Sequence, residues 1–287
     1  MSSFDLVISS SHAVAKGVRV RENALHICYC HTPMRYIWDQ YDQYFGPGRT
    51  GILTRVAMKA VLPALRRWDI HSSTGVTRFI ANSRNVQGRI KRIYDRSADI
   101  IHPPVDVDRF TVSTANDGYF LIVAALVPYK RVDLAIEAFN TLGRRLIVVG
   151  AGSEEKKLRN LAGSNIEFTG WVDDTTLSEY YEHCHALVFP GEEDFGIVPL
   201  EAMACGKPVV AFAQGGALET VIDNESSGTG ILFHRQTTED LIAAIQKLEH
   251  RMFDPERLRS KARQFGRSVF KERMREYVEE AWSELTR

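Results

Sequence analysis

Pro190-Gly191-Glu192-Glu193-Asp194-Phe195-Gly196-Ile197-Val198-Pro199-Leu200-Glu201 is the stretch that decides the fold. The apolar residues 186–189 before it predict a buried strand. The segment 191–196 predicts a turn at the carboxyl end of that strand, and 197–205 predicts a helix that contains Pro199 in its first turn, where proline is tolerated. This order is typical of a strand–loop–helix unit in an α/β sheet, in which ligands bind beside the carboxyl ends of the strands.

Such a unit would place two carboxylates at that edge, Glu193 in the loop and Glu201 one turn into the helix. The unpaired backbone N–H groups near Gly196 and Ile197 would lie at the start of the helix, where phosphate is attracted by free donors and by the positive end of the helix dipole. The spacing alone also fits an acidic loop in front of an ordinary amphipathic helix, so a purely structural role stays open at this point.

The second half of the chain alternates strand and helix patterns, which predicts a parallel sheet. The strands are expected at 119–126, 145–149, 166–169, 186–189, 208–212 and 230–233. Lys130 follows the first of them and therefore belongs to the same sheet edge as Glu193. After the second strand, Glu154 and Glu155 would repel an anion, so we expect an ordinary tight turn there, with Ser153 capping the next helix.

The first half predicts strands at 4–9, 26–30, 78–81 and 99–102, and His31 follows the second of these directly. The segment 49–68 predicts a helix kinked at Pro63. That helix combines an apolar stripe with a basic face made of Arg55, Lys59, Arg66 and Arg67. It fits either a core-packed helix with a solvated face or a contact with anionic lipid or a lipid-linked acceptor.

The composition describes an ordinary globular protein of two medium domains. The 287 residues have a hydrophobic content of 44% and zero net charge, and no apolar run approaches the ~20 residues of a membrane span. The charge is nevertheless uneven, with 15 Lys and Arg against 8 Asp and Glu up to Asp106. Four scattered cysteines and the lack of a basic, apolar leader fit a reducing cytoplasm. We expect no nucleic-acid partner.

No metal site is expected. His26, Cys28 and Cys30 alternate along one strand, which favours a packed strand face over zinc ligation. Asp106-Val107-Asp108 is formally an Asp-x-Asp sequence, but it lies in a short segment stiffened by two prolines. That segment is a better candidate for a linker than for a metal–diphosphate site.

The Glu-x7-Glu spacing, with Phe-Gly inside it and Glu-Ala-Met-Ala after it, resembles the signature of the retaining glycosyltransferases of family 4, which have the GT-B fold. The resemblance implies that Glu193 faces the donor sugar and that Glu201 holds the ribose of a nucleotide-sugar donor. It implies that the backbone of the intervening residues, Phe195, Gly196, Ile197 and Val198, holds the diphosphate.

Other positions follow from the same resemblance. Lys130 matches the family's lysine beside the leaving diphosphate, but the accompanying arginine is replaced by Ala125, with Arg131 close by in the sequence. Val172 follows the strand end that resembles the family's nucleobase contact. His31 resembles the histidine of the N-terminal domain that lies beside the transferred sugar.

The resemblance implies an α/β architecture with two Rossmann-like domains whose parallel sheets face a cleft. Residues 1–106 are expected to form a partial, acceptor-side domain, 107–118 a linker, 119–265 the donor-binding domain, and 266–287 a helix that crosses back to the first domain. The first domain is expected to be incomplete at its N-terminus, because the family's Gly-rich loop after its first strand has no counterpart here.

The implied reaction transfers a sugar with retention from a nucleotide diphosphate to a hydroxyl of a glycan or lipid-linked acceptor. The segments 29–36 and 126–131 resemble bacterial mannosyltransferases of O-antigen and capsule assembly, so GDP-mannose and lipopolysaccharide biosynthesis are the first expectation. The protein is expected in the cytoplasm, with peripheral contact to the inner membrane face. A non-catalytic nucleotide- or sugar-phosphate-binding module and a sugar-nucleotide epimerase-like enzyme remain as alternatives.

Overall fold

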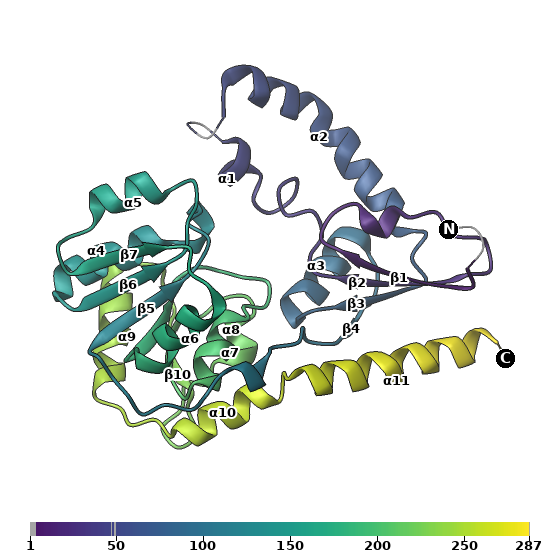
Figure 1. Cartoon of the computed structure of the whole chain (residues 1–287). Helices are drawn as coiled ribbons and strands as arrows, with labels where there is room; N and C mark the ends of the chain where they lie inside the picture. Colours follow the sequence, from purple (N-terminus) through teal and green to yellow (C-terminus); the bar gives the residue numbers. More distant parts are fainter. Residues whose placement is uncertain (1–3, 47, 49, 287) are drawn as a thin grey trace. The chain divides into compact units, whose positions relative to one another are not determined.

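The computed structural model describes residues 4–46, 48 and 50–286. The chain forms two compact α/β units. Unit 1 consists of residues 1–102 together with 270–287, and unit 2 of residues 103–269. Each unit is built on a parallel sheet (Figure 1). The alternating strand and helix patterns predict the sheet of unit 2, and the family resemblance implies that of unit 1.

Unit 1 contains a four-stranded parallel sheet in the order β1-β2-β3-β4. Its strands are β1 (Leu6–Ser11), β2 (Leu25–Cys30), β3 (Arg78–Ala81) and β4 (Asp99–Ile100). The helical segments of this part are η1 (Ala15–Gly17), α1 (Tyr41–Phe45), α2 (Ile52–Ser73), α3 (Arg84–Tyr94) and the last helix, α11 (Arg267–Leu285). The central strand β2 is buried along its whole length, as expected of a strand covered on both faces.

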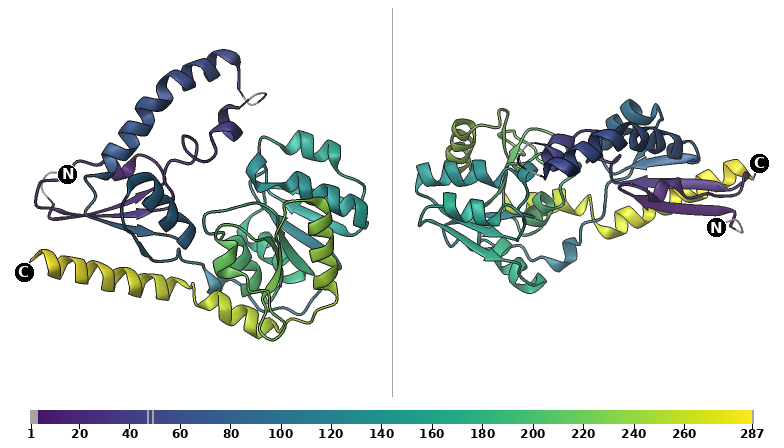
Figure 2. Two further views of the ribbon diagram at one scale, coloured as in Figure 1. Left: turned by 180° about the vertical axis from the view of Figure 1, so that it is seen from behind. Right: turned by 90° about the horizontal axis from the view of Figure 1, so that it is seen from above.

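Two helices cover the two faces of this sheet. Residues of α3 pack against Cys28, Cys30 and Phe79 on one face. On the other face, the apolar stripe of α11 packs against Leu25 and Ile27 of β2 and their neighbours. The right-hand view of Figure 2 shows α11 running alongside the strands of its unit. Sheet and helix thus share one buried layer although they come from opposite ends of the chain.

A buried ion pair fixes the end of α2. The Lys16 ammonium lies 2.6 Å from the Asp69 carboxylate, and both side chains are almost completely buried. The second carboxylate oxygen of Asp69 accepts hydrogen bonds from Trp38 Nε1 at 2.8 Å and from the Tyr94 hydroxyl at 3.0 Å. Buried charges persist only when they are paired and hydrogen-bonded, and this pair satisfies both requirements. The C-terminal half of α2 is therefore anchored, whereas its first turns are exposed.

Unit 2 contains a six-stranded parallel sheet in the order β10-β9-β8-β5-β6-β7. Its strands are β5 (Tyr119–Val123), β6 (Arg145–Val149), β7 (Ile166–Gly170), β8 (Ala186–Phe189), β9 (Val209–Phe212) and β10 (Gly230–Phe233). The strand order proceeds outward from β5 in one direction and from β8 in the other. The point between β5 and β8 is thus the topological switch point of the sheet, where open α/β sheets bind ligands.

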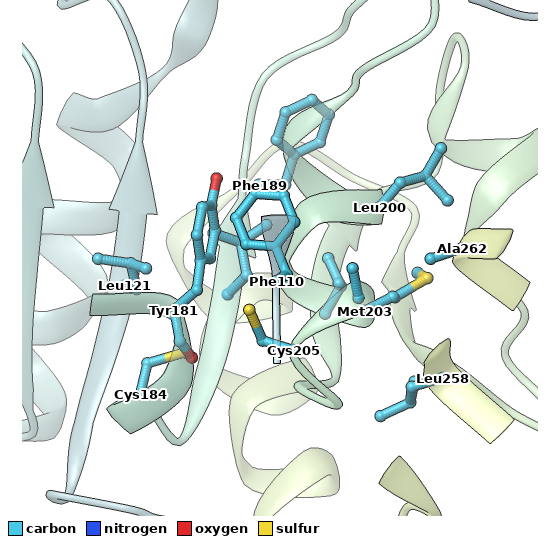
Figure 3. Close-up of a cluster of buried hydrophobic side chains, with 14 of the residues drawn as sticks. Phe110, Leu121, Tyr181, Cys184, Phe189, Leu200, Met203, Cys205, Leu258 and Ala262 are labelled. Carbon is cyan, nitrogen blue, oxygen red and sulfur yellow. The ribbon is translucent and has the colours of Figure 1, made fainter. Parts of the chain in front are cut away.

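Helices cover both faces of the unit 2 sheet. One face carries α6 (Asp174–His183), α7 (Val198–Ala204) and α10 (Pro255–Arg263), with Phe110 and Tyr181 at the centre of the apolar cluster (Figure 3). The other face carries α4 (Val132–Leu142) and α9 (Thr238–Glu249), seen from behind in Figure 2. The remaining helical segments of this part are η2 (Val107–Arg109), η3 (Pro128–Lys130), α5 (Glu155–Leu161) and α8 (Ala217–Thr220).

Most strands lie within two residues of their predicted bounds, and the differences have local causes. The first strand begins and ends two residues later than expected, because Ser10 and Ser11 continue the pairing with Tyr29 and Cys30. The prediction that Ser153 caps a helix was wrong. Helix α5 begins at Glu155, and no side chain caps it.

Candidate active site

Two charged side chains meet at the switch point of unit 2. Lys130, at the end of η3 after β5, forms an ion pair with Glu193, in the loop after β8. Their side chains are only 15% and 18% exposed. Because β5 and β8 are parallel neighbours, the loops that follow them leave the same edge of the sheet. The structure thus brings together the lysine and the carboxylate that the sequence assigned to that edge.

Close backbone packing holds the two loops together. A Cβ atom on Gly191 would lie 2.7 Å from the Cα atom of Lys130, so only glycine fits between the loops. The next loop, after β9, approaches in the same manner, since a Cβ on Gly215 or Gly216 would lie 2.1 Å from the carbonyl oxygen of Glu193 or Phe195 respectively. In addition, the Gly216 N–H donates to the Glu193 carbonyl at 2.9 Å. Three glycines thereby fix the backbone that carries Glu193.

Glu201 lies in the first turn of α7 and is held from two sides. Its Oε2 accepts a hydrogen bond of 2.8 Å from the hydroxyl of Tyr181, which is fully buried. Its Oε1 lies 3.8 Å from the Arg109 guanidinium. Burial raises the pKa of the Glu201 carboxyl, and the hydrogen bond from Tyr181 and the charge of Arg109 counteract that rise. The Glu201 side chain remains 19% exposed and can therefore accept a ligand hydroxyl.

The residues between the two glutamates have different surroundings. Phe195 is buried, and its ring packs against Phe265 at 5.6 Å between centroids, so its side chain anchors the loop. Gly196 has a φ of +82°, and Ile197 and Val198 begin α7. Among the described residues, the backbone N–H groups of Gly196 and Ile197 donate to no backbone carbonyl. These donors are available to an anionic ligand beside Lys130.

Arg131 has protein partners of its own. Its Nε donates to Asp133 at 3.2 Å and its Nη1 donates to the side-chain oxygen of Gln236 at 2.9 Å. The Gln236 amide in turn donates to the carbonyl of Pro190 at 2.8 Å. Arg131 thus connects the loop after β5 to the loop that carries Glu193. Ala125 is exposed and carries no charge, so it supplies no second cation.

Val172 and His31, two further sequence-predicted residues, have surroundings of their own. Val172 is half-buried and packs against the apolar cluster of unit 2. His31 belongs to unit 1, at the carboxyl end of β2, where its Nε2 lies 2.8 Å from the Ser10 hydroxyl. Burial, together with the nearby His12, lowers the pKa of His31 and so favours the neutral imidazole.

Sequence reasoning missed Arg109, Tyr181 and Gln236. Arg109 lies within the segment 107–118 that was predicted to be a linker, and Tyr181 is one of the aromatic residues of α6. Nothing in the local pattern marks either as a partner of Glu201. Among the residues that the structure describes, no group of three His, Cys, Asp or Glu side chains could hold a metal ion. No helix in this part of the chain is both long and apolar enough to cross a bilayer.

The fold and the charged sheet edge define a class of protein, and comparison with known proteins identifies the family. Two units with parallel sheets, and a site at the switch point of the second, are features of the GT-B glycosyltransferases. The chain belongs to the glycosyl transferases group 1, whose family description matches residues 107–265.

Relatives in this family are similar to the chain over a little more than half its length. An uncharacterized glycosyltransferase of Methanocaldococcus jannaschii is 29% identical over 183 residues, covering 62% of this chain and 51% of the relative. A GDP-mannose-dependent alpha-(1-6)-phosphatidylinositol monomannoside mannosyltransferase of Mycolicibacterium smegmatis is 31% identical over 216 residues, covering 63% of this chain and 56% of the relative. The chain spans about half the length of the curated relatives it matches.

Solved structures show the same fold. Sucrose-phosphate synthase from Thermosynechococcus elongatus is similar with a TM-score of 0.75 at 20% identity, covering 98% of this chain and 74% of that one. The Anabaena protein HepE, crystallised in complex with UDP, is similar with a TM-score of 0.73 at 18% identity, covering 97% of this chain and 79% of that one. These likenesses confirm the predicted α/β fold with parallel sheets.

Proposed function

We propose that this protein is a retaining glycosyltransferase that takes its sugar from a nucleotide diphosphate. The observation that carries the proposal is the Lys130–Glu193 ion pair at the switch point between β5 and β8. A cation, a carboxylate and free backbone donors meet there, and Glu201 stands one helical turn further along. This set matches the charges and hydroxyls of a nucleotide sugar.

Donor binding would separate Lys130 from Glu193 and give each of them a partner on the ligand. The diphosphate competes for the Lys130 ammonium and leaves Glu193 able to accept hydrogen bonds from hydroxyls of the sugar. When the bond between the sugar C1 and the diphosphate oxygen breaks, its electron pair stays on that oxygen, and Lys130 stabilises the new charge. The acceptor oxygen then forms its bond to C1, and its proton passes to the leaving diphosphate. Glu201 binds ribose hydroxyls throughout.

His31 remains a proposed catalytic residue of the acceptor-side unit. The Ser10 hydroxyl holds one ring nitrogen, which fixes the orientation of the imidazole at the end of β2. Arg131 and Val172 remain proposed donor-binding residues. The partners Asp133 and Gln236 make Arg131 better suited to holding the loop than to direct contact with phosphate.

GDP-mannose is the proposed donor. It is supported by the sequence resemblance to family 4 mannosyltransferases of O-antigen and capsule assembly, and by the relative whose name specifies GDP-mannose. UDP-sugars are the competing donors, because HepE was crystallised with UDP-glucose as well as with UDP. We propose a glycan or lipid-linked acceptor in cell-surface polysaccharide assembly, such as lipopolysaccharide.

We also propose peripheral contact with the anionic, cytoplasmic face of the plasma membrane through the first half of α2. Ile52, Leu53 and Val56 are 75%, 87% and 62% exposed there. Arg55 and Lys59 lie on the same turns, and no Asp or Glu occurs between Asp42 and Asp69. Exposed apolar side chains whose only charged neighbours are basic suit a helix that lies on an anionic membrane surface.

The test of the function is donor cleavage by the purified chain. Isothermal titration with GDP, UDP, GDP-mannose and UDP-glucose would identify the nucleotide. Each bound donor would then be incubated with and without lipid-linked acceptor, and the released nucleoside diphosphate measured. We expect release with wild-type protein and at least a tenfold loss in Glu193→Ala, by analogy with the removal of an electrostatic contact to a transition state.

The alternatives give different products in the same assay. Ala125, which stands where the family has an arginine, is the feature that favours a non-catalytic binding module. Such a module would bind nucleotide without releasing any from the donor. An epimerase-like enzyme would instead yield an epimerised sugar nucleotide or free sugar without requiring an acceptor.

A further inference from the structure

Arg109 is a charged residue beside the nucleotide site to which the proposed reaction assigns no role. It lies at the end of η2, far from α6 and α7 in the sequence but in contact with both. Its guanidinium stacks on the Phe110 ring at 4.5 Å, and its Nη1 lies 2.9 Å from the Asp174 carboxylate. Its Nη2 faces Glu201 Oε1 at 3.8 Å. The guanidinium is thus fixed from two sides while its positive charge faces Glu201.

We propose that Arg109 is a positioning residue of the nucleotide site, which keeps the Glu201 carboxylate ionised and oriented toward the ligand's ribose hydroxyls. The proposal rests on the proposed role of Glu201 in nucleotide binding. Glu201 is mostly buried, and burial penalises its charged form. An ionised carboxylate accepts hydrogen bonds at both oxygens, whereas a protonated carboxyl group has one O–H that acts as a donor.

The two carboxylate oxygens of Glu201 have different surroundings. Oε2 is occupied by the Tyr181 hydroxyl at 2.8 Å. Oε1 is 3.8 Å from Arg109, which is too long for a hydrogen bond but close enough for strong charge attraction. Oε1 therefore stays available to a ribose hydroxyl while the cation behind it maintains its charge. The Arg109 Nε is buried and has no hydrogen-bond partner in the described structure, so the guanidinium is not fully hydrogen-bonded as an ordinary structural arginine is.

The groups around Glu201 have opposite effects on the ionisation of its carboxyl. Tyr181 of α6 and Arg109 of η2 favour its ionised form, whereas Asp174 of α6 disfavours it. Cys205, at the end of α7, is buried and its raised pKa keeps the thiol neutral. Arg259 of α10 donates instead to the carbonyl oxygens of Phe110 and Ala204. Removal of Arg109 and removal of Asp174 should therefore shift the titration of Glu201 in opposite directions.

The experiment measures that titration in the full chain. The Glu201 carboxyl carbon is followed by NMR from pH 4 to 9 in the wild type, Arg109→Met and Asp174→Asn, with Glu201→Gln to assign the signal. In parallel, the Kd for GDP and for UDP is measured at pH 6 and pH 8. We expect the midpoint of Glu201 to rise in Arg109→Met and to fall in Asp174→Asn. The loss of affinity between pH 8 and pH 6 should be on the order of three- to tenfold larger in Arg109→Met than in the wild type, as expected for the loss of one nearby charge.

Two further variants separate positioning from folding. Arg109→Lys keeps the charge and should restore most of the pH profile, whereas Arg259→Met removes a structural arginine and should lower the Tm without changing that profile. An unchanged Glu201 midpoint in Arg109→Met, or the same shift in Arg259→Met, would overturn the proposal. If Glu201→Gln binds GDP and UDP as tightly as the wild type, the role of Glu201 in the proposed function fails, while the NMR titration still decides the role of Arg109.

Discussion

The Lys130 ammonium and the Glu193 carboxylate are paired with each other across the switch point between β5 and β8. Glu193 therefore competes with the donor diphosphate for Lys130. In the same way, Lys130 competes with the donor sugar for Glu193. A diphosphate must displace Glu193 from Lys130, and the displacement releases Glu193 for the donor sugar. The first predictions depend on this exchange.

Glu193→Gln should separate nucleotide binding from turnover. Without the carboxylate, Lys130 no longer has to be released, so GDP or UDP should bind as tightly as in the wild type or up to about fivefold tighter, which corresponds to about 1 kcal/mol. Sugar transfer should fall at least tenfold, because the amide cannot accept hydrogen bonds as a charged group does. Titration calorimetry and a transfer assay measure the two effects. Clearly weaker binding of the nucleoside diphosphate would contradict the exchange.

Lys130→Ala should lower kcat more than donor affinity. Negative charge grows on the leaving diphosphate in the transition state, and the loss of one stabilising group there costs about 10²–10³ in rate. The matched control is Lys157→Ala, which removes an exposed lysine of α5 from the same unit. A change in KM alone would make Lys130 a ground-state anchor.

Glu201→Gln should weaken nucleotide binding and stabilise the free protein at neutral pH. Burial raises the pKa of Glu201 above its ordinary 4.5, so the folded state binds its proton more tightly than the unfolded state does. The contribution of this group to stability is therefore fully present below pH 4.5 and is lost as the pH rises through the folded-state pKa. Thermal unfolding from pH 4 to 8 should show a Tm advantage of the variant that grows with pH. A constant difference in Tm would contradict the raised pKa.

Gly191→Ala should disrupt the site through packing. The new Cβ would lie 2.7 Å from the Lys130 Cα, so one of the two loops must move, at a cost of about 1–3 kcal/mol. We expect a lower free energy of unfolding in urea and weaker donor cleavage. In the control, Gly88→Ala, no atom lies within 4 Å of the new Cβ on helix α3, and the helix should gain about 0.5–1 kcal/mol. Equal effects of the two variants would show that the loops tolerate displacement.

Arg55→Glu combined with Lys59→Glu should abolish binding of the chain to anionic vesicles. Each basic residue near such a surface contributes about 1 kcal/mol, and the reversal also adds repulsion. Sedimentation with vesicles that contain 30% phosphatidylglycerol would measure the loss, with Lys156→Glu and Lys157→Glu on α5 as the control pair. If the α2 variant sediments like the wild type, the exposed turns of α2 have another role.

Local sequence patterns determined where most strands of this protein lie and which residues follow them at one sheet edge. Apolar runs and turn residues located the strands of both sheets to within about two residues at most ends. Lys130 and Glu193 could be assigned to one sheet edge from sequence alone, because residues that directly follow parallel strands leave the sheet at the same side. The helix start after Gly196 and the first-turn position of Glu201 followed from the same local reasoning.

The tertiary structure alone decided which side chains meet at that edge. Strand order placed β5 beside β8, and that adjacency paired Lys130 with Glu193. Arg109 and Tyr181 reach Glu201 across 92 and 20 residues of sequence, and Gln236 reaches Arg131 across 105. Periodicity and spacing describe only neighbours along the chain. Contacts between distant segments depend on how the sheet is ordered and how its helices pack, so no local pattern could reveal them.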